Sequence, residues 1–97
     1  MFDKIKDMYS LQKQARQLKK DLKNTHIEAE FDGVVAVVDG EQEIISITFP
    51  EEHAKNPKKL AGSIVKALNK AIKKSQQIAA EKMKPLMGGL NLPGSGS

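Results

Sequence analysis

The 97-residue chain has a formal net charge of +4 and contains no Cys and no Trp. This length allows one domain with a thin core, and the lack of Cys excludes disulfide bonds and thiolate catalysis. The sequence also lacks the long apolar run of a membrane span and the apolar core of a signal peptide, so we expect a cytoplasmic protein.

Residues 2–24 predict a helix, because they contain no Pro or Gly and their apolar residues recur at spacings of 3 and 4. The apolar seam is narrow, as in a helix that lies against another helix. A helix of about 20 residues is roughly 30 Å long, so part of it should project from a small core or meet a partner. We predict that this seam is a dimer interface, formed by Met8, Leu11, Ala15, Leu18 and Leu22.

Three short strands are expected over residues 27–31, 34–38 and 44–49. The first alternates apolar and acidic residues, the second is apolar on both faces, and Pro50 ends the third. An Asp-Gly pair follows each of the first two strands, which is typical of tight turns. The pattern therefore predicts an antiparallel β-meander, and the second strand needs a cover on both of its faces.

A second, longer helix is predicted to begin at Pro57, with Asn56 as its cap. Apolar residues keep helical spacing as far as Lys84, and we expect Pro85 to end or kink the helix. The fold class is therefore α+β: a helix, a three-stranded antiparallel β-meander and a long C-terminal helix. Residues 1–87 should form a single domain, and residues 88–97 a flexible tail rich in Gly, Ser and Pro.

The charges are strongly segregated along the chain. Residues 25–52 hold eight acidic side chains and no Lys or Arg, whereas the segments on either side carry net charges of +4 and +8. On a helical wheel, most of the basic residues of each helix share one arc. We predict that these two stripes bind the phosphates of DNA; they comprise Lys6, Lys13, Arg16, Lys20 and Lys23, and Lys59, Lys66, Lys70, Lys73 and Lys74.

The alternative for the stripes is an ordinary solvated face, but such a face usually mixes both signs of charge. Nothing in the sequence indicates an enzyme, a cofactor or a metal site. His26 and His53 stand alone without ligand spacing, and the acidic residues Asp39, Glu41 and Glu43 fit a polar hairpin loop better than a cation-binding loop. No phosphate-binding loop or nucleophile motif is present.

The order of these elements resembles the YbaB/EbfC family over almost the whole chain. The opening MYSLQKQARQLKKDL is similar to the family's Met- and Gln-rich first helix. The segments DGVVAVVDGEQEIISITFPEE and KALNKAIKKSQQIAAEKM, with the later GGLNLPG, resemble the family's strands, late helix and tail. Two departures are that residues 34–40 are one residue shorter than the family pattern, and that Phe49-Pro50 replaces Asp-Pro.

The resemblance implies a tweezer-like homodimer whose helical arms bind double-stranded DNA with weak sequence preference, in a nucleoid or gene-regulatory role. It supplies no motif of DNA-contacting residues, so the predicted site rests on the two stripes. The main alternative is a protein–protein adaptor that captures a partner helix with the apolar seam. Membrane-surface binding is disfavoured by the lack of aromatic anchors, and RNA stays open because phosphates do not distinguish the nucleic acids.

Overall fold

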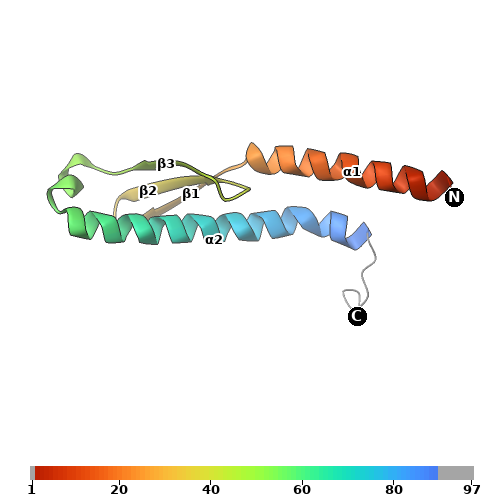
Figure 1. Cartoon of the computed structure of the whole chain (residues 1–97). Coiled ribbons are helices and arrows are strands. Elements are labelled where there is room, and N and C mark those ends of the chain that lie inside the picture. Colours follow the sequence, from red (N-terminus) through yellow and green to blue (C-terminus); the bar gives the residue numbers. More distant parts are fainter. Residues whose placement is uncertain (1, 90–97) are drawn as a thin grey trace.

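The computed structural model describes the backbone of residues 2–89 and the side chains of residues 9–86. It confirms the expected α+β order (Figure 1). The elements are helix α1 (Phe2–Lys23), strands β1 (His26–Phe31), β2 (Val34–Asp39) and β3 (Ile44–Thr48), the 3₁₀ helix η1 (Glu51–Lys55), and helix α2 (Pro57–Gly89). Helix η1 has no counterpart among the elements expected from the sequence.

The three strands form the expected antiparallel meander, with β2 in the centre. The turn between β1 and β2 has positive φ at both central residues, 50° at Asp32 and 81° at Gly33. This is the type I′ conformation, whose twist matches that of the flanking strands. The pairing of β2 with β3 is interrupted between Val37 and Val38, where the register shifts.

Helix α2 covers one face of the sheet, and the core lies between them. Most of the fully buried core side chains are small, which lets the helix approach the sheet closely. The buried core residues are Ile27, Ala29, Val34, Ala36, Val38, Ala67 and Ala71. On the other face of the sheet, Val35 and Val37 are half-buried and Glu28 and Glu30 are exposed, so the second apolar face of β2 has no full cover within the chain.

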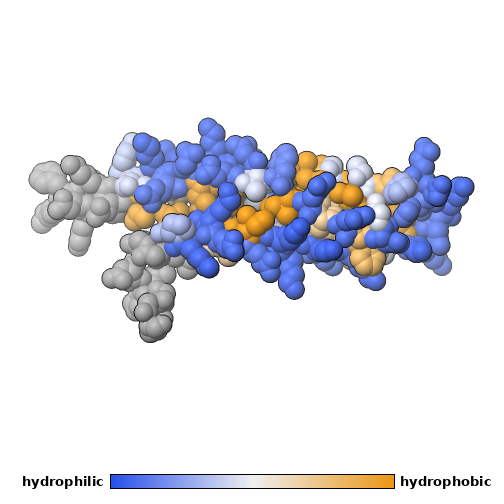
Figure 2. Space-filling view, turned by 180° about the vertical axis from the view of Figure 1, so that it is seen from behind, coloured by the Kyte–Doolittle hydropathy of each residue, from blue (hydrophilic) through white to orange (hydrophobic). Residues whose placement is uncertain are grey.

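The molecule is elongated, with extents of 66 × 28 × 14 Å and a radius of gyration of 18.7 Å. A compact chain of this length would have a radius of gyration of about 13 Å. The difference arises because α1 extends beyond the sheet and lies alongside the C-terminal half of α2 (Figure 1). Seen from behind, hydrophilic side chains cover most of the surface, and hydrophobic surface gathers in a strip along the middle (Figure 2).

The end of α1 is fixed to the turn that follows β2. The Gly40 amide donates a hydrogen bond of 2.7 Å to the carbonyl oxygen of Leu22, and the Leu22 side chain is only 9% exposed. A Cβ atom at Gly40 would lie 2.7 Å from that same oxygen, so no side chain fits there. The direction in which α1 leaves the sheet therefore depends on this close backbone contact.

Helix α2 begins as expected, because Asn56 Oδ1 accepts a hydrogen bond of 3.3 Å from the Lys59 amide. We expected Pro85 to end or kink the helix, and the first of these alternatives is wrong, since the helix continues to Gly89. Proline removes one helical hydrogen bond, but Pro85 is exposed and lies near the end of the helix, where water can hydrate the freed carbonyl oxygen. The greater part of the expected tail, residues 90–97, lies outside the described residues.

Candidate nucleic-acid interface

The stripe on α1 is freely accessible. The side chains of Lys13, Arg16, Lys20 and Lys23 are all exposed, while that of Lys6 lies outside the described residues. Lys13 and Arg16 line a shallow hollow of about 210 Å³ together with Gln12 and Tyr9, and Tyr9 is 71% exposed. This part of α1 therefore offers cations, an amide and an aromatic ring on one open surface.

Two lysines of the α2 stripe are engaged by the sheet. Lys70 Nζ donates a hydrogen bond of 3.2 Å to the backbone oxygen of Glu30, and Lys74 Nζ donates one of 3.1 Å to that of Glu28. Strand β1 is at the edge of the sheet, so these carbonyl groups have no partner strand. The two lysines therefore satisfy and protect the edge of β1, a role that the helical wheel could not reveal.

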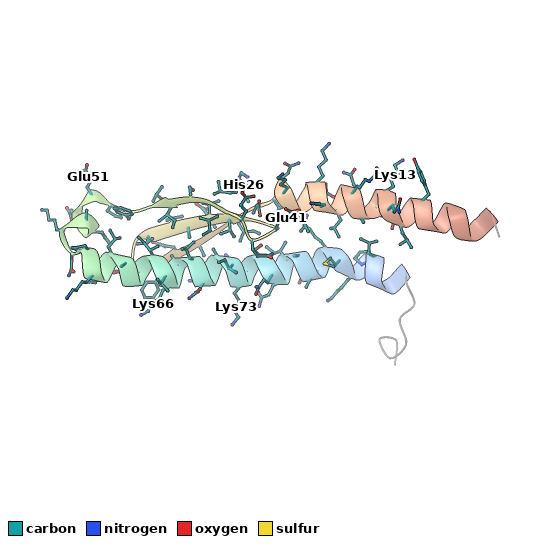
Figure 3. The ribbon with its side chains drawn as sticks, viewed as in Figure 1. Lys13, His26, Glu41, Glu51, Lys66 and Lys73 are labelled. Atoms are coloured by element: carbon teal, nitrogen blue, oxygen red, sulfur yellow. The ribbon has the colours of Figure 1, made fainter. Side chains whose placement is uncertain are left out.

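The other α2 lysines differ in their surroundings. Lys59 Nζ lies 4.0 Å from Asp32 Oδ2, and Lys66 Nζ lies 4.8 Å from the centre of the Phe31 ring. Lys66 and Lys73 point away from α1 and β3, and Lys13 lies on the opposite outer side of the molecule (Figure 3). One chain thus carries two separate basic surfaces rather than a single continuous one.

The apolar seam of α1 is used unevenly within the chain. Leu22 is buried against the turn at Gly40, Leu11 and Leu18 are half-buried, and Ala15 is exposed. The side chain of Met8 lies outside the described residues. Within one chain, the helix that α1 contacts is α2.

The acidic loop after β2 is a structural turn. The buried carboxylate of Asp39 accepts hydrogen bonds of 2.8 and 3.0 Å from the backbone amides of Glu41 and Glu43. Ser75 donates a hydrogen bond of 2.7 Å to the Asp39 carbonyl oxygen, which ties this turn to α2. Within the part of the chain that the structure describes, no group of three or more potential ligands could hold a metal ion.

Phe31 was not among the predicted site residues, although two of its lysine neighbours, Lys59 and Lys66, belong to the α2 stripe. Phe31 ends β1 and is 37% exposed, although strand alternation assigned it to the covered face. It lines a groove of about 620 Å³ beside the first turns of α2, with Asp32, Lys58, Lys59, Gly62, Ser63 and Lys66. The sequence contained a signal for this exposure. Phe31 directly precedes the Asp-Gly turn, where the sheet ends and is less fully covered.

No described helix combines the length and hydropathy needed to cross a bilayer. A chain of known structure, an uncharacterized protein HP0035 from Helicobacter pylori, has the same fold, with a TM-score of 0.65 at 16% identity. The match covers 76% of this chain and 90% of that one.

Relatives of higher identity are named nucleoid-associated proteins. One from Syntrophobacter fumaroxidans is 32% identical, over 96% of this chain and 88% of the relative. One from Clostridium acetobutylicum is 35% identical, over 93% of this chain and 84% of the relative. The model of the YbaB/EbfC DNA-binding family matches residues 1–90. The chain belongs to the YbaB/EbfC DNA-binding family.

Proposed function

We propose that the protein is a non-enzymatic, nucleoid-associated DNA-binding protein that holds duplex DNA mainly through phosphate contacts. The single observation that carries this proposal is the α1 stripe, where Lys13, Arg16, Lys20 and Lys23 are all exposed. No ion pair among the described side chains occupies these cations, since the one pair found there joins Lys59 to Asp32. Cations spaced along a helix suit DNA, which carries one negative charge per ~1.7 Å of its axis.

The binding is proposed to depend little on sequence. Lysine and arginine contacts to phosphate position a protein on the duplex but do not read bases. The acidic sheet should favour contacts from the helices, because the exposed carboxylates of Glu28 and Glu30 repel phosphates. Location in the cytoplasmic nucleoid follows from this function.

We further propose that the protein acts as a homodimer. Two features support this: the seam residues Leu11 and Leu18 are only half-buried, and Val35 and Val37 lack a full cover on the outer face of the sheet. A second copy would cover part of this apolar surface and would double the number of basic stripes. Two arms could then contact one duplex together.

The test is a titration of wild-type protein against two unrelated duplexes at several salt concentrations. If roughly 5–8 phosphates are neutralised, the slope of log affinity against log salt should be about −5 to −7 for both duplexes. Arg16→Ala and Lys20→Ala should weaken binding to both duplexes equally and reduce the slope by about 1 each. Lys55→Ala is the matched control, because Lys55 is exposed on η1 and belongs to neither stripe.

A flat salt response, or stripe variants that bind like wild type, would return these residues to an ordinary solvated face. The adaptor function would then be favoured, with the seam on α1 as its surface. A single-stranded RNA competitor in the same titration distinguishes a DNA-binding protein from a general polyanion binder. Competition as strong as that of duplex DNA would contradict a DNA-specific role.

A further inference from the structure

The groove beside Phe31 combines positive charge with an aromatic ring. Three lysines line it, Lys58, Lys59 and Lys66, against one carboxylate, that of Asp32. Asp32 lies 4.0 Å from Lys59, which leaves Lys58 and Lys66 without an acidic partner among the described side chains. The groove is therefore suited to a ligand that carries negative charge.

The position of Lys66 is set by the ring. Its ammonium group lies 4.8 Å from the centre of the Phe31 ring, a cation–π distance. This contact orients the cation without neutralising it, so its N–H groups can still donate to a phosphate oxygen. The ring and the charge are thus held together at one place.

Gly62 lines the groove without filling it. It lies inside α2, where glycine is unfavourable, and a Cβ atom there would have no neighbour within 4 Å. Packing within the chain therefore does not require a glycine at this position. A larger side chain would instead project into the space that Phe31 and Lys66 line.

We propose that this groove binds an unpaired nucleotide of DNA, with its base against the face of the Phe31 ring that Lys66 leaves free and its phosphate at Lys58 and Lys66. Stacking on an aromatic side chain needs a base whose face is free, which the interior of a duplex does not offer. The groove therefore selects single-stranded ends or gaps. This inference rests on the proposed DNA binding and adds a second site, distinct from the α1 stripe.

The test compares a blunt duplex with the same duplex extended by a short single strand. Wild-type protein should bind the extended duplex about fivefold more tightly or better, as expected for one base–aromatic stack. Phe31→Leu should abolish this preference and keep the affinity for the blunt duplex, whereas Phe31→Tyr should retain the preference. Gly62→Gln should weaken it by filling the groove, and Val65→Gln, at an exposed α2 position outside the groove, should leave it unchanged.

Equal affinity of wild type for the two probes would overturn the inference, as would a folded Phe31→Leu variant that keeps the preference. Circular dichroism establishes that each variant is folded. Failure to bind either probe would contradict the proposed function as a whole. Normal salt-dependent binding of the blunt duplex without any preference would contradict the groove alone.

Discussion

Replacing Gly40 by Ala should detach α1 from the sheet. The new Cβ atom would lie 2.7 Å from the Leu22 carbonyl oxygen and 2.9 Å from the Leu22 Cα atom, and real Cβ atoms do not approach backbone that closely. The helix must therefore shift, which lengthens the 2.7 Å hydrogen bond from the Gly40 amide and exposes the buried Leu22 side chain. Burial of a leucine contributes about 1.5–3 kcal/mol and such a hydrogen bond about 1 kcal/mol.

We therefore expect Gly40→Ala to lower the free energy of unfolding by about 2–4 kcal/mol, which for a chain of this size lowers the Tm by more than about 10 °C. The assay is thermal and urea denaturation at one fixed protein concentration. Gly62→Ala is the matched control, because its Cβ would enter open space and should stabilise α2 by up to about 1 kcal/mol. Equal stability of the Gly40→Ala and wild-type proteins would refute the reasoning that this contact holds α1.

Three further predictions concern the proposed surfaces. Leu18→Asp should lower the Tm and dissociate the dimer in light scattering, because Leu18 is a half-buried residue of the apolar seam, and a persistent dimer would contradict the seam as its interface. Changing Glu28 and Glu30 to Gln should leave the affinity for duplex DNA the same or slightly higher in a mobility-shift assay; a marked loss would mean that the sheet contacts DNA. Lys73→Ala should weaken DNA binding more than Lys70→Ala, because Lys70 is held by the Glu30 carbonyl oxygen; the reverse order would show that this contact gives way to phosphate.

The sequence predicted most of the fold because its local signals agree with one another. The Asp-Gly pair at residues 32–33 forms the type I′ turn that this dipeptide favours, and Asn56 caps α2 as expected. The end of α2 was not predictable from Pro85 alone. An exposed proline near the end of a helix loses a hydrogen bond that water replaces, whereas the same residue in a buried turn would break the helix.

The candidate site was less predictable, because its contacts join residues far apart in the sequence. A helical wheel groups Lys70 with Lys73, but only the fold brings Lys70 to the edge of β1, 40 residues earlier. The periodicity of a strand likewise assigns Phe31 to the covered face, although α2 leaves part of it exposed. The polar side of a helix or strand follows from its local sequence. The contacts of each side chain depend on how the helices and strands pack together.

The same packing explains how the acidic sheet can lie against α2, the most basic helix of the chain. The carboxylates of Glu28 and Glu30 are exposed, while their backbone oxygens accept hydrogen bonds from Lys74 and Lys70. A charged donor strengthens a hydrogen bond to a carbonyl group, so these lysines stabilise the sheet without needing an ion pair. Both lysines are also exposed, so each can bind the edge of β1 in the free protein. Before either lysine can bind a phosphate of DNA, it must leave its backbone oxygen, and water must hydrate that oxygen instead. The loss of these hydrogen bonds costs free energy, and the exposed cations of α1 have no such cost. The affinity for DNA should therefore depend more on α1 than the number of lysines on α2 suggests.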